Sequence, residues 1–241
     1  MMEFDFFGKT VLVTGYFSDI GYGICDMYFK NNARVISTYN RTYMIDRINS
    51  SVELFHLDLE DLNSVYEFIN NLKDKGINKI DILVNNIGVC DINPLIFQDD
   101  YKIISLININ LTNTIILTKY ILKDFMGENG KIINISSIWG RVGASCEIPY
   151  SVSKGGINLF TKSLSQEMNS RNIKVIGISP GFIKTKMNKH IKDDDIKEII
   201  GEIPLGLFGE VYHVVDSIKF FSSDYSNLSG EIINIDGGWM L

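Results

Sequence analysis

Cysteine and histidine are scarce in this sequence. Cysteine occurs three times in 241 residues, an odd number at distant positions without the spacing of metal ligands. A fold held by disulfides and a cysteine-ligated metal are therefore not expected, and the thiols suit the reducing cytoplasm. The three histidines have no neighbours that suggest a catalytic or metal-binding role, so no metal is expected. These residues are Cys25, Cys90, Cys146, His56, His190 and His213.

Excess positive charge and long apolar runs are lacking as well. The net charge is −6, whereas duplex binding depends on clustered lysine and arginine. The apolar stretch from Ile103 to Leu122 is interrupted by three asparagines and a lysine, which indicates a buried helix rather than a membrane span. Residues 1–9 have no basic segment followed by an apolar core, so no secretory signal is expected. We expect a cytoplasmic protein that binds neither nucleic acid nor membranes.

Short apolar, β-branched runs alternate along the chain with longer segments of helical spacing. This alternation is typical of βαβ units with a parallel sheet, and the continuously apolar strands suit a sheet covered on both faces. Without a visible linker, residues 1–241 are predicted to form a single doubly wound α/β domain with about seven parallel strands. Strands are expected at 10–14, 34–38, 52–57, 80–85, 131–136, 174–179 and 232–236, and helices near 21–31, 62–75, 99–126, 149–170 and 210–222.

A glycine-containing turn joins the first strand to the first helix. It spans Thr14 to Gly21 and reads TGYFSDIG. Such a turn offers free backbone N–H groups and the positive end of a helix dipole, which suit a pyrophosphate. Gly15 permits a tight turn, and Gly21 lets the helix pack near the strand. The alternative is an ordinary βα loop in which glycine serves only the backbone.

The end of the second strand bears on the choice of cofactor. Enzymes that use NAD place an acid there for the ribose 2′-hydroxyl, but here Asn40 and Arg41 follow the strand and Asp46 is the first acid. The guanidinium of Arg41 can hold a 2′-phosphate, with Asn40 as a further donor. NADP(H) is therefore the predicted cofactor, with NAD as an alternative. Arg41 can instead be a solvated surface residue.

Tyr150 and Lys154 stand four residues apart in the pentapeptide YSVSK, which places them on one face of a helix. A free tyrosine titrates near pH 10 and needs help to exchange protons at neutral pH. A nearby ammonium lowers the tyrosine pKa by attraction. The alternative is a packed tyrosine beside a solvated lysine.

Together these motifs resemble the short-chain dehydrogenase/reductase family, which has a Rossmann-type fold. Further matches are NNIG at 85–88, SS at 136–137, PG at 180–181 and IDGG at 235–238. The resemblance covers essentially the whole chain. Within the family, residues 170–173 and 180–183 look most like 3-oxoacyl-[acyl-carrier-protein] reductases.

The resemblance implies roles for four catalytic residues. Ser137 orients the substrate carbonyl, Tyr150 donates the proton, and Lys154 binds the nicotinamide ribose and lowers the tyrosine pKa. Asn110 supports the lysine and a chain of waters to solvent, with Asn108 as the alternative assignment.

The resemblance also implies a set of cofactor contacts. Three positions depart from the family pattern: Asp19 replaces the middle glycine of the turn, Ser18 stands where NADP-preferring relatives often have a basic residue, and Ile87 replaces alanine. Asp19 can cap the helix but also lies near the anionic ligand. The predicted contacts are Gly15, Ser18, Asp19, Ile20, Gly21, Asn40, Arg41, Asp58, Leu59, Asn86, Gly88, Tyr150, Lys154, Ile183 and Thr185.

The remaining expectations concern substrate and partners. Residues 186–209 are expected to cover the substrate, and Cys146 to line the pocket or to be structural. The predicted reaction is NADPH-dependent reduction of a ketone or 3-oxoacyl thioester, by a homotetramer. A small free ketone, sugar or polyketide-type substrate is an alternative, as is a non-catalytic dinucleotide-binding scaffold. An acyl carrier protein would need basic residues at the pocket mouth, for which Lys131, Arg171 and Lys174 are candidates, offset by Glu128.

Overall fold

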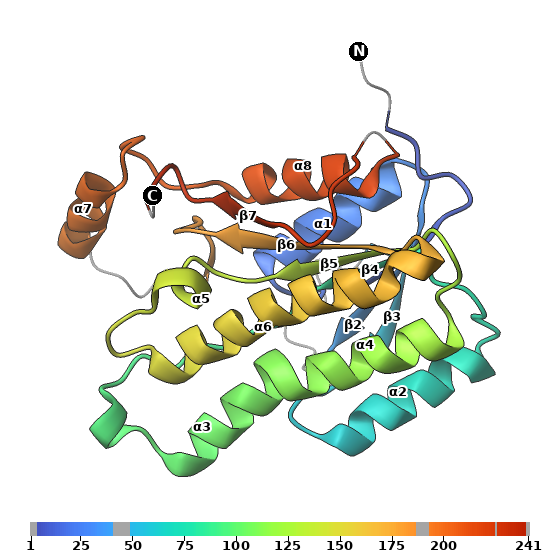
Figure 1. Cartoon of the computed structure of the whole chain (residues 1–241), viewed down its shortest axis with the longest axis horizontal. Helices are drawn as coiled ribbons and strands as arrows, with labels where there is room; N and C mark the ends of the chain where they lie inside the picture. The colour runs from blue at the N-terminus through green and yellow to red at the C-terminus, as the bar shows by residue number, and fades with distance from the viewer. Residues whose placement is uncertain (1–3, 41–48, 187–192, 225, 240–241) are drawn as a thin grey trace.

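A computed structural model describes residues 4–40, 49–186, 193–224 and 226–239, without the side chains of 193–195. Seven parallel strands form one sheet in the order β3-β2-β1-β4-β5-β6-β7 (Figure 1), as predicted. The order reverses between β1 and β4, which lie side by side. The strands are β1 (Thr10–Val13), β2 (Arg34–Tyr39), β3 (Val52–His56), β4 (Ile82–Asn85), β5 (Lys131–Ile135), β6 (Lys174–Pro180) and β7 (Ile232–Ile235).

Helices cover both faces of the sheet, each over its own apolar core. One core includes Tyr28 and Val214 and lies beneath α1 and α8, whereas the other includes Phe68 and Leu117 and lies beneath α2, α4 and α6 (Figure 1). Burial on both faces explains why the strands are continuously apolar. The α-helices are α1 (Asp19–Lys30), α2 (Leu62–Asp74), α3 (Asp100–Ile107), α4 (Asn113–Asp124), α5 (Trp139–Val142), α6 (Ile148–Glu167), α7 (Asp193–Glu202) and α8 (Val211–Ser222).

The helix predicted for 99–126 is divided by a π-helical turn. This turn, η3 (Asn108–Thr112), joins α3 to α4 and carries the buried side chain of Asn110. Single π-turns within α-helices often mark functional positions. The helix α5 and the short 3-10 segment η2 (Leu95–Phe97) lie outside the predicted helices, whereas α7 lies in the segment expected to cover the substrate and the 3-10 segment η4 (Met168–Arg171) overlaps the end of the helix predicted near 149–170.

A chain of buried polar side chains crosses the sheet beside the site. The Asn85 amide donates to Thr118 Oγ1 at 2.9 Å and to Asn134 Oδ1 at 2.8 Å, and the Asn134 amide donates to Thr161 Oγ1 at 2.9 Å. These bonds tie β4 and β5 to α4 and α6. Because buried polar groups require partners, they fix how both helices sit against the strands. No described helix is long and apolar enough to cross a bilayer.

Candidate active site

The glycine turn lies where the strand order reverses, the position at which ligands bind in doubly wound sheets. Asn86, directly after β4, reaches across to it. The Asn86 backbone N–H donates to Thr14 Oγ1 at 2.9 Å, and its side-chain amide donates to the Thr14 carbonyl at 2.8 Å and to Ser18 Oγ at 3.2 Å. The structure thus brings Asn86 to the predicted pyrophosphate turn.

Both glycines of the turn are required by its geometry. Gly15 has φ +84°, a left-handed conformation that favours glycine. A Cβ atom on Gly21 would lie 2.1 Å from the Gly15 carbonyl oxygen. The backbone therefore turns tightly enough to aim the start of α1, including Ile20, at a ligand. This arrangement fits a dinucleotide pyrophosphate.

Ser18, not Asp19, caps α1. The Ser18 hydroxyl accepts the Gly21 N–H at 2.9 Å, so it is occupied within the turn. The Asp19 carboxylate instead accepts the backbone N–H of Lys186 at 2.7 Å. Asp19 therefore joins the phosphate turn to the segment after β6, a contact that the sequence did not reveal.

The residues expected at the adenosine end follow β2 and β3. Asn40 is exposed directly after β2, while Arg41 lies outside the described residues. Asp58 follows β3 and its carboxylate accepts the Glu60 N–H at 2.9 Å. Leu59 is buried, and its carbonyl accepts the Asn113 amide at 2.8 Å. Asn40 and Asp58 lie after neighbouring strands and could contact one ligand.

Lys154 is almost completely buried on α6. Its ammonium nitrogen lies 5.8 Å from the centre of the Tyr150 ring and donates to the Ile135 carbonyl at 2.9 Å. Burial lowers the Lys154 pKa to about 8. Gly88 passes closely over this ammonium, because a Cβ at Gly88 would lie 3.0 Å from Lys154 Nζ.

The pKa of Tyr150 is raised, contrary to the expected lowering by Lys154. Burial of the phenol is the largest cause, and a side-chain hydrogen bond with Ser137 acts in the opposite direction. Without cofactor the protein thus favours a protonated tyrosine, which is the form that donates a proton. Ser137 itself is buried just after β5, and its hydroxyl accepts the Trp139 N–H at 3.2 Å.

Asn110 clamps the loop after β4. Its amide oxygen accepts the Val89 N–H at 2.8 Å, and its amide nitrogen donates to the Val89 carbonyl at 2.8 Å and to Ser153 Oγ at 3.1 Å. Ser153 precedes Lys154, so Asn110 links the loop to α6. The structure brings Asn110 into the site, whereas Asn108 is only half-buried at the start of the π-turn.

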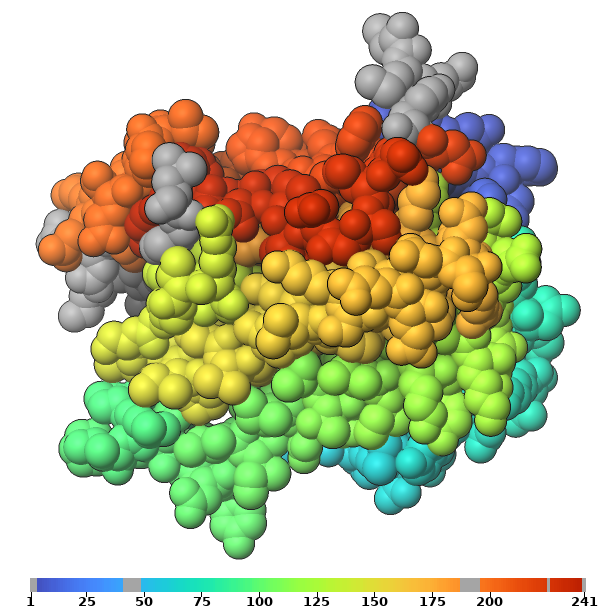
Figure 2. All heavy atoms as spheres, in the orientation of Figure 1, coloured from blue at the N-terminus to red at the C-terminus, as the bar shows by residue number. Residues whose placement is uncertain are grey.

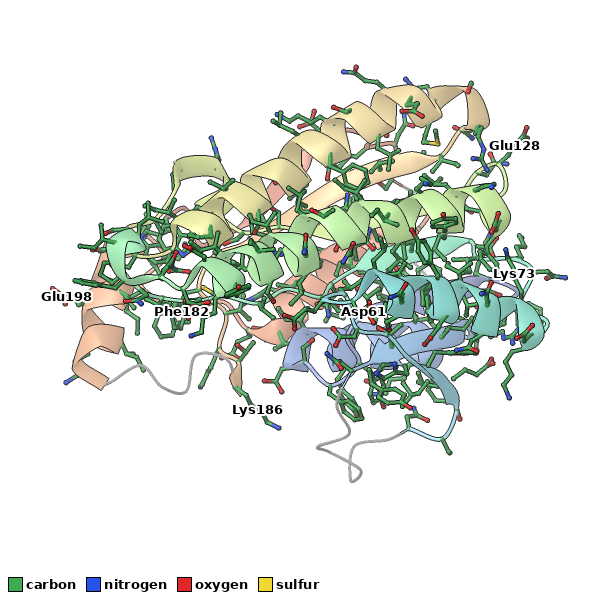
Figure 3. The ribbon with its side chains drawn as sticks, turned by 90° about the horizontal axis from the view of Figure 1, so that it is seen from below. Asp61, Lys73, Glu128, Phe182, Lys186 and Glu198 are labelled. Carbon is green, nitrogen blue, oxygen red and sulfur yellow. The ribbon has the colours of Figure 1, made fainter. Side chains whose placement is uncertain are left out.

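The segment after β6 lies at the carboxyl edge of the sheet. Ile183 is buried and pairs with Gly209 in a short parallel bridge, and Thr185 is half-buried. Figure 3 shows Phe182 and Lys186 near one end of the molecule and Glu128 at the other. Of the expected cover 186–209, α7 is described, whereas 187–192 lie outside the described residues.

Cys90 and Glu147 form a pair near Tyr150 that the sequence analysis did not predict. The Cys90 thiol donates to Glu147 Oε2 at 2.9 Å, and both groups raise the pKa of Tyr150. Cys146, the cysteine expected near the pocket, has its sulfur 3.7 Å from Ser145 Oγ. Their positions in the sequence could have indicated that both lie near the site, because Cys90 comes two residues after Gly88 and Glu147 comes three residues before Tyr150.

Lys131 and Lys174, two of the basic residues considered as contacts for a carrier protein, lie away from Tyr150 within a single copy of the chain. Lys131 and Lys174 begin β5 and β6, at the edge opposite the catalytic residues. Their ammonium groups donate to the Ser222 and Ser226 carbonyls, and Arg171 donates to the Leu122 carbonyl.

The histidines that the structure describes have structural contacts. His213 Nδ1 accepts the Glu210 N–H at the start of α8, and the His56 ring packs edge-on against Tyr39. Within the described ranges, no cluster of His, Cys, Asp and Glu could hold a metal.

Comparison with known proteins agrees with this geometry. The family profile described as short chain dehydrogenase matches residues 9–196. The 3-oxoacyl-[acyl-carrier-protein] reductase of Escherichia coli strain K12 is 31% identical over 97% of this chain and 98% of its own, and that of Chlamydia pneumoniae is 32% identical over 98% and 99%.

Solved structures share the fold. A short-chain dehydrogenase/reductase from Brucella melitensis, termed a glucose/ribitol dehydrogenase, superposes with a TM-score of 0.91 at 24% identity over all of both chains. A 4-hydroxyisoleucine dehydrogenase complexed with NADH gives 0.89 at 24% identity, over 96% of this chain and 98% of its own. This chain therefore belongs to the short-chain dehydrogenase/reductase family of NAD(P)-dependent oxidoreductases.

Proposed function

We propose that this protein reduces the 3-oxo group of an acyl thioester with NADPH, as a 3-oxoacyl-[acyl-carrier-protein] reductase does. The observation that carries the proposal is the position of the Lys154 ammonium, 5.8 Å from the ring of the half-buried Tyr150, with Ser137 as the side-chain hydrogen-bond partner of that tyrosine. A hydroxyl pair beside an ammonium, at the same sheet edge as a pyrophosphate turn, suits a carbonyl under reduction.

Each catalytic side chain has a distinct task in this proposal. When bound, the reduced nicotinamide supplies the hydride. The Ser137 hydroxyl donates a hydrogen bond to the substrate carbonyl oxygen, and Tyr150 delivers its proton to that oxygen. Lys154 then stabilises the phenolate and binds the nicotinamide ribose, while Asn110 keeps Val89 and Ser153 in register around it.

NADPH is the proposed cofactor because Asn40 and Arg41, rather than an acid, follow β2. A carboxylate there would repel a 2′-phosphate, whereas guanidinium and amide groups can bind it. NAD remains the alternative cofactor, because the 4-hydroxyisoleucine dehydrogenase with a similar fold is complexed with NADH.

A homotetramer is also proposed. The helices α3 and α6 lie side by side at the surface of the molecule (Figure 2). They carry exposed apolar side chains, including Tyr101 at 82% and Leu159 at 68% exposure. A neighbouring subunit would bury this apolar surface. Docking of an acyl carrier protein would then depend on surfaces of the assembled tetramer, since Lys131 and Lys174 lie far from the pocket of their own subunit.

The test is oxidation of NADPH with acetoacetyl-N-acetylcysteamine, a neutral thioester. We expect turnover in the wild type and a loss of about 100-fold or more in Tyr150→Phe, with NADPH binding retained. Turnover of a free sugar or simple ketone without the thioester would favour the small-substrate alternative. Tight NADPH binding without reduction of any carbonyl would support a non-catalytic scaffold.

A further inference from the structure

Two loops meet over the catalytic tyrosine through the Cys90–Glu147 pair. Cys90 belongs to the loop after β4, and Glu147 directly precedes α6. The thiol donates to Glu147 Oε2 at 2.9 Å, and nearby the Asn93 N–H donates to the Cys146 carbonyl at 2.8 Å. Both loops are thus held together on the open side of Tyr150.

Glu147 brings a negative charge close to the reacting position. It directly precedes α6, three residues before Tyr150, and its charge raises the pKa of Tyr150. The Cys90 thiol occupies Oε2, and Glu147 forms no ion pair with any part of the chain that the structure describes. Its side chain is half-buried, so water screens its charge in part.

Opposite charges lie beside one another next to Cys90. A shallow cavity of about 220 Å³ adjoins Cys90, and there the Lys102 ammonium lies 3.6 Å from the Asp91 carboxylate, so the two compensate each other. Lys154 is buried and directed at the Ile135 carbonyl. The Glu147 carboxylate, which raises the pKa of Tyr150, therefore places a negative charge near the phenol.

We propose that Glu147, oriented by Cys90, determines specificity by rejecting carbonyl compounds that carry an anionic group beside the carbonyl. The inference rests on the proposed function and deepens it. A free 3-oxo acid is ionised at neutral pH, whereas its thioester or ester is not. Glu147 would thus favour binding of the uncharged thioester or ester over the free acid of the same acyl chain.

The test compares acetoacetate with methyl acetoacetate, which differ by one charge at nearly equal size. In the wild type, kcat/KM is expected to favour the ester. Glu147→Gln should raise kcat/KM for acetoacetate relative to the ester by roughly tenfold. Glu147→Asp keeps the charge and should keep the preference. Glu128→Gln removes one charge at the far end of the molecule (Figure 3) and serves as the matched control.

The outcomes separate the inference from the proposed function. Equal use of acid and ester by the wild type, an unchanged ratio in Glu147→Gln, or the same change in Glu128→Gln would overturn the role of Glu147 while reduction itself stands. Failure of the wild type to reduce the thioester and both ketones would overturn the proposed function and the inference with it. Thermal unfolding of each variant verifies that it is folded, and Glu147→Ala, which also removes the charge, carries the test if Glu147→Gln does not fold.

Discussion

The backbone N–H of Lys186 donates to the carboxylate of Asp19 at 2.7 Å, across 167 positions of sequence. Asp19 begins α1, at the turn that fits a pyrophosphate, and Lys186 follows the Ile183–Thr185 segment expected at the nicotinamide. The contact holds the two ends of the proposed cofactor site together. It also leaves a negative charge beside the proposed position of an anionic ligand.

Replacement of Asp19 by asparagine is expected to strengthen NADPH binding. The amide oxygen can still accept the Lys186 N–H, whereas the repulsion of the pyrophosphate, on the order of 1 kcal/mol, disappears. Fluorescence titration should show a Kd lowered by roughly fivefold. Asp26→Asn removes the same charge further along α1, where Asp26 pairs with Lys30, and should leave Kd unchanged. A weaker binding of NADPH by Asp19→Asn would contradict the prediction.

Gly21→Ala is expected to damage both stability and cofactor binding. The new methyl group would lie 2.1 Å from the Gly15 carbonyl oxygen, so the turn must open. We expect a loss of about 1–3 kcal/mol in the free energy of unfolding, measured by urea denaturation, and a much weaker affinity for NADPH. Gly201→Ala in α7 meets no atom within 4 Å and should be neutral or stabilising.

Asn110→Ala is expected to lower both kcat and stability. The side chain makes two hydrogen bonds to Val89 and one to Ser153, and its loss leaves the part-buried N–H and carbonyl of Val89 without these partners. The free energy of unfolding should fall by about 2–3 kcal/mol. Asn108→Ala, two residues earlier on the same π-turn, should cost less in both measurements. Equal effects of the two variants would contradict the assignment of Asn110, rather than Asn108, as the asparagine that supports the site.

Lys154→Met is expected to abolish turnover but to stabilise the fold. Burial lowers the Lys154 pKa from 10.5 to about 8, so the folded state disfavours the charge that the unfolded chain carries at pH 7. Removal of that charge should raise the free energy of unfolding by about 1–2 kcal/mol, after the lost bond to the Ile135 carbonyl is subtracted.

The pH dependence follows from the same shift. Between about pH 8 and 10.5 the unfolded chain binds a proton at Lys154 that the folded chain does not. The contribution of Lys154 to wild-type stability therefore rises with pH in this window, and the advantage of Lys154→Met should shrink as the pH rises from 8. Urea denaturation of both proteins from pH 7 to 9.5 measures the difference, and a constant difference would contradict the assigned pKa.

Local sequence patterns were sufficient to predict most of the secondary structure. Apolar runs predicted all seven strands within two residues at each end, since burial on both faces demands apolar side chains throughout. The long helix at 99–126 was predicted as one piece, because the π-turn at Asn108–Thr112 arises from packing and leaves no local signature.

The sequence by itself determined the order of the elements, the glycine turn and the Tyr150–Lys154 spacing, because these depend on neighbours along the chain. Tertiary structure alone decided which distant groups meet, as in the contacts of Asp19 with Lys186 and of Cys90 with Glu147. It also decided the direction of the Tyr150 pKa, which burial raises, since desolvation depends on the atoms that surround the phenol and not on the residues beside it in the sequence.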